Sequence, residues 1–163
     1  YGLKEEFPYV FAAIAIAIAT ATFLNGSLVL RYGMEKLITV SLIVFFLTSV
    51  TYVMIFLGRE NPSIQVLIAF LGVQFFAISF LFGNLRSAAM QPIGHIAGIG
   101  SAITGCIATI MSVPISTFIG RFVNTTTLPL FIGFSICSTL ALVILVYLKV
   151  SNQKIRKLNL RTK

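Results

Sequence analysis

The residues that could do chemistry in this chain are few, and most lie outside its long apolar stretches. The sequence has four Glu, one His and no Asp, with no phosphate-cradling glycine loop and no metal-ligand spacing. Cys106 and Cys137 lie within apolar stretches, where a thiol behaves as a small hydrophobic group. We therefore expect no enzyme activity, no catalytic residue, no bound metal and no cofactor.

One polar side chain stands out because it lies near the middle of an apolar stretch. Gln74 shares a helical face with Phe70, Ala77 and Leu81. A polar group in hydrocarbon costs free energy unless it faces protein or a wet cavity. Aromatic contact and one hydrogen bond would suit a lipophilic or amphipathic ligand. We predict that Gln74 and Phe70 bind substrate, and the alternative is an amide that only packs helices.

Hydroxyl side chains in other apolar stretches are further candidates for the substrate site. They belong to Thr22, Ser101 and Thr104. The alternative for each is a hydrogen bond to its own helix backbone, which is common for Ser and Thr in membrane helices.

The composition indicates that lipid is the solvent of the elements that carry these residues. Hydrophobic residues make up 58% of the 163, charged residues only 10%, and the mean hydropathy is +1.01. A water-soluble domain needs roughly a quarter to a third of its surface charged. The net charge is +8, but six of the twelve Lys and Arg lie in the last fifteen residues. Cations gathered in a tail do not predict a nucleic-acid partner.

Five stretches are long and apolar enough to cross a bilayer as helices, which takes about 20 residues. The sequence therefore predicts an all-α membrane protein, with a bundle in residues 1–148 and a basic tail in residues 149–163 that attracts anionic lipid headgroups. Five crossings put the termini on opposite sides, and the positive-inside rule puts the C-terminus in the cytoplasm. The five stretches are residues 8–30, 37–57, 63–83, 97–120 and 128–148.

The segment between the first two stretches contains a motif with regular spacing. Gly33 suits a tight turn, and the charge of Arg31 is favourable at a helix C-terminus. The segment resembles the short cytoplasmic loop motif of the major facilitator superfamily, although Leu30 replaces its acidic residue and Met34 and Glu35 replace two basic ones. The alternative is a plain positive-inside turn. The positions that match the motif are Gly26, Leu28, Arg31, Gly33 and Leu37.

A second motif lies between the third and fourth stretches. Its residues are Pro92, His95, Ala97, Gly98, Ser101, Ala102 and Gly105. The motif resembles the junction of the tenth and eleventh helices in the bicyclomycin-resistance (Bcr/CflA) type of drug:proton antiporter.

This resemblance implies a function for the whole protein. The chain would correspond to helices eight to twelve of a twelve-helix inner-membrane transporter, in which the tenth helix lines the central cavity. Such a transporter exports drugs or other small amphipathic compounds in exchange for protons, by alternating access. The five stretches contain no charged side chain, and the chain starts with Tyr1. We therefore expect a fragment whose N-terminal half is missing and carries the proton-binding carboxylate.

Small residues and one proline in the fourth stretch predict packing or bending. Gly98 and Gly105 would let two helices approach closely, and Pro114 would kink its helix. Two other classes of function stay open: a small oligomeric channel or permease subunit, and a membrane scaffold that transports nothing.

Overall fold

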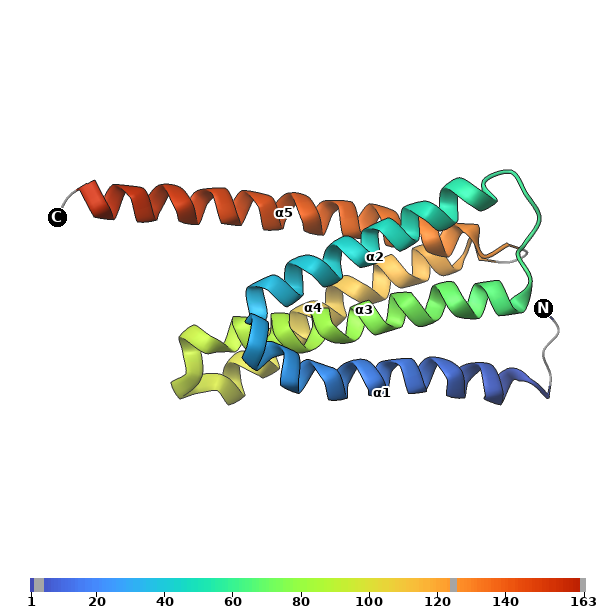
Figure 1. Ribbon diagram of the computed structural model, residues 1–163, viewed down its shortest axis with the longest axis horizontal. Helices are drawn as coiled ribbons and strands as arrows, with labels where there is room; N and C mark the ends of the chain where they lie inside the picture. The colour runs from blue at the N-terminus through green and yellow to red at the C-terminus, as the bar shows by residue number, and fades with distance from the viewer. Residues whose placement is uncertain (2–4, 124–125, 162–163) are drawn as a thin grey trace.

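The computed structural model describes residues 1, 5–123 and 126–161, and their side chains as far as residue 151. In this part of the chain the regular structure is entirely helical (Figure 1). The elements are α1 (Phe7–Tyr32), α2 (Met34–Phe56), α3 (Ile64–Met90), the 3-10 helix η1 (Gln91–Ile96), α4 (Ala97–Gly120) and α5 (Leu128–Arg161).

Four helical segments are long and apolar enough to cross a membrane. They are Phe7–Tyr32, Met34–Phe56, Ile64–Gly120 and Leu128–Ser151. The third contains α3, η1 and α4, and the chain reverses its direction at η1 (Figure 1). The prediction of an all-α chain with several membrane-length helices is confirmed at this level.

Local sequence explains where the helices begin and end. Pro8 lies in the first turn of α1, where its missing N–H costs nothing. Gly33 alone separates α1 from α2, with a φ of 81° that other residues rarely adopt.

Pro114 does not interrupt α4, which runs through to Gly120. The hydroxyl of Ser112 donates to the carbonyl of Thr109, 3.2 Å away.

The interior of the bundle is formed by α2, α3 and α5. Its centre is a buried cluster of Tyr52, Leu67 and Phe131, one residue from each of these helices. The rings of Tyr52 and Phe131 are stacked, with centroids 3.6 Å apart. Helix α1 packs mainly against α3. Helices α1 and α4 each have one buried residue, so the core depends on the other three helices.

The helix α5 does not end where its apolar stretch ends. It continues to Arg161, so the backbone of the basic tail extends the helix (Figure 1). Tyr1 and the C-terminal end of α5 lie at opposite ends of the molecule, as expected for an odd number of helices that alternate in direction (Figure 1).

Candidate functional site

Gln74 lies in the interior, between α3 and α2. Its side chain is fully buried, and so is that of Ser49 on α2. The Gln74 Nε2 atom donates a hydrogen bond to Ser49 Oγ, which in turn donates to the carbonyl of Phe45 at 2.7 Å. Among the described residues the Gln74 Oε1 atom has no hydrogen-bond partner. Gln74 therefore joins two helices and keeps one unsatisfied acceptor.

Phe70 lies one turn before Gln74 and belongs to the aromatic core. Its ring centroid is 5.1 Å from that of Tyr52 and 6.3 Å from that of Phe131, and both contacts are edge-on. Edge-on contacts between aromatic rings stabilise a packed interior. Within this chain Gln74 and Phe70 therefore contact neighbouring helices, as the helix-packing alternative expects. Their contact with a substrate stays a prediction.

The other three candidate residues lie on different helices and bond their own backbone. Thr22 Oγ1, on α1, donates to the Ile18 carbonyl at 2.9 Å. On α4, Ser101 Oγ donates to Gly98 at 2.9 Å, and Thr104 Oγ1 donates to Gly100 at 2.8 Å. The structure does not bring these hydroxyls together with Gln74.

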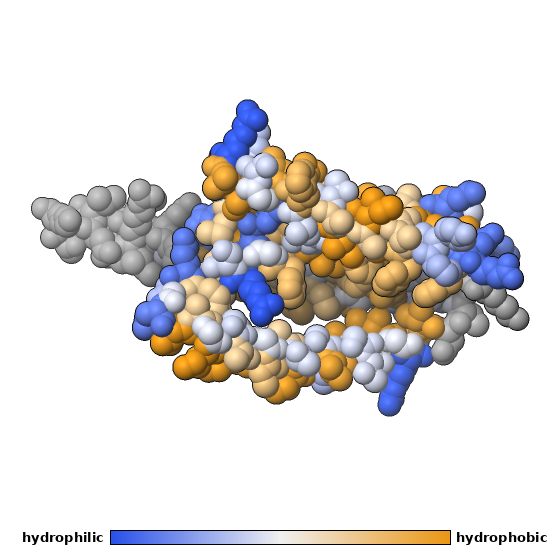
Figure 2. Space-filling view, turned by 90° about the horizontal axis from the view of Figure 1, so that it is seen from below, coloured by the Kyte–Doolittle hydropathy of each residue, from blue (hydrophilic) through white to orange (hydrophobic). Residues whose placement is uncertain are grey.

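A hollow separates α4 from most of the molecule. Figure 2, which looks at the molecule from the α1 side, shows α4 as a row of small and apolar side chains along the lower edge, with a hollow between this row and the rest. No contact joins α1 to α4 within the described residues. Large apolar side chains of α4 are exposed, among them Ile99, Ile103 and Ile107 at 64%, 55% and 52%. Nothing in the described chain covers these side chains of α4, and α1 has only Ala21 buried.

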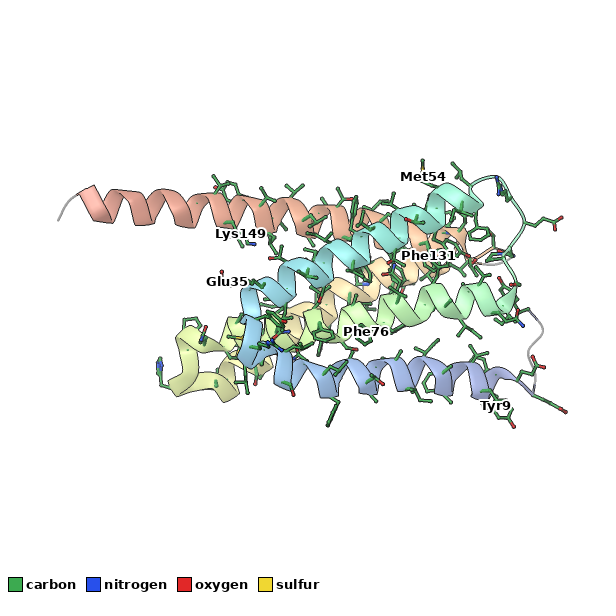
Figure 3. All side chains as sticks on the ribbon, viewed as in Figure 1. Tyr9, Glu35, Met54, Phe76, Phe131 and Lys149 are labelled. Atoms are coloured by element: carbon green, nitrogen blue, oxygen red, sulfur yellow. The ribbon has the colours of Figure 1, made fainter. Side chains whose placement is uncertain are left out.

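A second concavity lies between α2, α3 and α5. It is a groove of about 910 Å³, lined mainly by apolar side chains. Glu35 and Lys149 lie at one end of it, where α2 begins and α5 leaves the bundle (Figure 3). The Lys149 Nζ atom donates to Thr39 Oγ1 at 2.8 Å. The sequence analysis missed this groove, because its walls come from three separate stretches.

The predicted loop motif forms the turn between α1 and α2. Gly26 is exposed within α1, and Gly33 makes the turn itself. The guanidinium of Arg31 is exposed and lies 5.5 Å from the centroid of the Tyr32 ring.

Near this turn, two asparagines join α1 to α3. Asn84 Nδ2 donates to Asn25 Oδ1 at 2.7 Å and to the Phe80 carbonyl at 2.9 Å. Asn84 is 2% exposed, so this pair is an interior contact of the same kind as Gln74 and Ser49. The sequence analysis did not single out these residues, although an amide near the end of an apolar helix was the available signal.

Close helix approach occurs at a glycine that the sequence analysis did not choose. A Cβ atom at Gly98 or Gly105 would have no heavy atom within 4 Å. The packing predicted for these two residues is therefore not made by the described chain. At Gly133 on α5 a Cβ atom would collide with the side chain of Ile119 on α4. The side chain of Ile119 therefore packs directly against the backbone of α5 at Gly133.

A polar cluster lies at the end of the bundle where α2 ends and α5 begins. The hydroxyls of Tyr52 and Thr127 are 2.6 Å apart, and the Thr127 N–H donates to Asn61 Oδ1 at 3.1 Å. Nearby, the hydroxyl of Tyr1 donates to the carbonyl of Pro62 at 2.7 Å. Burial raises the pKa of Tyr1, and a hydrogen bond with Thr127 partly opposes this shift. The cluster connects the α2–α3 loop to the start of α5.

Comparison with known proteins identifies no relative: no family model, no curated protein and no solved structure matches the chain.

Proposed function

We propose that this chain is part of a secondary active transporter that exports small amphipathic compounds across the inner membrane. In such proteins two helical bundles rock against each other and expose a central site first to one side and then to the other. The observation that carries the proposal is the hollow beside α4, with surfaces of α1 and α4 that nothing in the described chain covers. A second bundle would find there the space and the apolar surface that it needs. The resemblance of two segments to the major facilitator superfamily supports the same assignment.

In the proposed topology the chain crosses the membrane five times. The reversal at η1 supports separate crossings by α3 and α4, since a continuous 57-residue helix would be about 85 Å long and far exceed a bilayer. Charged side chains lie outside the apolar stretches. The described cations at the C-terminal end of α5 are Arg31, Lys36, Arg86 and Lys149, against Arg59 and Arg121 at the opposite end. The positive-inside rule compares the Lys and Arg on the two sides, so it puts the C-terminal end of α5 in the cytoplasm.

The proposed exchange with protons requires a carboxylate in the membrane. The five apolar stretches proposed to cross the membrane carry no Asp, Glu, Lys or Arg. A group that binds and releases a proton during transport must titrate within the membrane. The proposal therefore assigns the proton-carrying carboxylate to a second bundle, which works with this chain.

The test is proton-driven efflux by the intact protein. We would reconstitute it in liposomes, impose a pH gradient and follow the export of ethidium, with the variants Gly105→Leu and Cys106→Leu. Position 105 lies on the face of α4 that carries the small residues Ala97, Ser101 and Thr109, and position 106 is the adjacent residue on another face. We expect Gly105→Leu to abolish efflux, because the added side chain would obstruct a second bundle, and Cys106→Leu to preserve it.

Three outcomes would contradict the proposal. The first is unchanged efflux in Gly105→Leu. The second is ion conductance that needs no pH gradient, which would indicate a channel subunit. The third is no transport at all of any amphipathic probe by the intact protein, which would indicate a scaffold.

A further inference from the structure

The groove between α2, α3 and α5 is a wedge that widens toward the Lys149 end. Toward the C-terminal end of α2, helices α2 and α5 are in contact: Tyr52 stacks on Phe131, and the rings of Phe45 and Phe134 are 5.4 Å apart. Toward Lys149 the two helices diverge (Figure 1). At this end, within the described chain, the only side-chain hydrogen bond between α2 and α5 is the one from Lys149 to Thr39.

The walls of the wedge suit a hydrocarbon chain better than water. They are formed mainly by apolar side chains such as Ile38, Leu42, Leu81 and Leu145. The hydroxyls among them already donate elsewhere: Thr39 Oγ1 to the Glu35 carbonyl at 2.7 Å, and Ser138 Oγ to the Ser135 carbonyl at 3.1 Å. Water in a cavity needs several polar partners. A flexible apolar chain needs none.

The charge at the mouth of the wedge favours an anion. Lys149 lines the mouth and forms no ion pair with the described residues. Glu35 lies at the same mouth, but this end of the bundle also carries Arg31, Lys36 and Arg86, so its cations outnumber its carboxylate. An anionic group beside Lys149 would find a charge-assisted hydrogen-bond donor there.

We propose that the wedge binds an anionic phospholipid, with an acyl chain between α2 and α5 and the phosphate at Lys149. Lys149 then acts like a snorkelling side chain, whose stem lies along the apolar wall while its ammonium group meets the headgroup. This inference depends on the membrane position of the helices and not on transport, so it stands even if the efflux test fails.

The experiment uses the absence of Trp from the chain. We would introduce one Trp at Leu145, which lines the wedge, or at Val143, which is 62% exposed on another side of α5. Each full-length variant goes into phosphatidylcholine vesicles that contain a small fraction of brominated phosphatidylglycerol, whose bromine atoms quench nearby Trp fluorescence. The same pair is then prepared with Lys149→Gln and with Lys149→Arg.

We expect quenching at position 145 to correspond to about fivefold enrichment of the anionic lipid over the bulk membrane, from the attraction of one cation near the surface. Lys149→Gln should remove the enrichment and Lys149→Arg should preserve it. Quenching at position 143 should follow the bulk composition in all variants.

Four results would overturn the inference. The first is equal quenching at both positions, and the second is enrichment that persists in Lys149→Gln. The third is equal enrichment of brominated phosphatidylcholine, which would indicate a site for any acyl chain. The fourth is no quenching at position 145, which would indicate a wedge closed by protein. Enrichment at position 145 in the variant that keeps Lys149 shows that the introduced Trp leaves the wedge intact, and preserved enrichment in Lys149→Arg shows that a cation at position 149 is sufficient.

Discussion

The hydrogen bond between Gln74 and Ser49 makes a strong prediction about the stability of the bundle. Both side chains are fully buried, and one acceptor of Gln74 has no partner among the described residues. Ser49→Ala removes the only partner that the described part of the chain offers the Gln74 amide, leaving the whole polar group unsatisfied in the interior. A buried polar group without a partner costs about 1–3 kcal/mol. We therefore expect Ser49→Ala to lower the free energy of unfolding by that amount.

Gln74→Leu should be far less harmful, although it is the more drastic chemical change. It removes one interhelical hydrogen bond, a type that contributes about 0.6 kcal/mol on average in a membrane protein. It also removes the unsatisfied Oε1 atom, and Leu has an apolar side chain that fills similar space. The two effects oppose each other, so we expect a change within about 1 kcal/mol. Ser49 keeps its bond to the Phe45 carbonyl in this variant.

The double variant Ser49→Ala/Gln74→Leu isolates the interaction. Once Gln74 is absent, Ser49→Ala should lower the free energy of unfolding by less than about 0.5 kcal/mol, so the two sites should be coupled by about 0.5–3 kcal/mol. The assay is thermal unfolding of the detergent-solubilised protein followed by circular dichroism, in which about 1 kcal/mol corresponds to a shift of about 2–4 °C for a chain of this size. A larger loss for Gln74→Leu than for Ser49→Ala, or additive effects in the double variant, would refute the assignment of Gln74 to helix packing.

Two further predictions concern glycines and use the same unfolding assay. Gly33→Ala should lower the free energy of unfolding by about 1–3 kcal/mol, because the φ of 81° and ψ of 154° at this turn suit glycine alone. Gly26→Ala, in the α1 helix with open space around it, should raise the free energy of unfolding by about 0.5–1 kcal/mol. Equal effects of the two substitutions would contradict the turn at Gly33. Gly133→Leu should lower the free energy of unfolding by about 1–3 kcal/mol because its side chain would overlap Ile119. Gly105→Leu, in the α4 helix with open space around its Cβ, should not destabilise the protein, and the reverse order would place the α4 contact elsewhere.

The class of fold and most helix boundaries are predictable because their signals are local. Apolar length gives the helices, and Pro8 and Gly33 mark a beginning and a turn. The extension of α3 to Met90 is not predictable from hydropathy, since the predicted third stretch stops at Gly83. Asn84, the first residue after that stretch, lies within the helix and bonds Asn25 on α1 and the Phe80 carbonyl. The bond to Asn25 depends on a neighbouring helix, which hydropathy does not reveal.

The candidate site was harder to predict for the same reason. The face of α3 that carries Gln74 can be read from spacing, but whether that face meets a cavity or another helix depends on α2, where Ser49 provides the partner. Likewise, every helical glycine permits close approach, and only the crossing of α4 and α5 selects Gly133. The wedge at Lys149 requires three helices to be placed before it exists.

The most direct test of the account is the membrane topology of the full chain. After Cys106 and Cys137 are changed to Ser, single cysteines would replace the exposed residues Lys36, Glu60, His95 and Phe122. These would be labelled from one side of a sealed membrane with an impermeant maleimide. Five crossings predict that positions 36 and 95 react from the cytoplasmic side and positions 60 and 122 from the opposite side. Reaction of positions 95 and 122 from the same side, or of all four from both sides, would contradict the account.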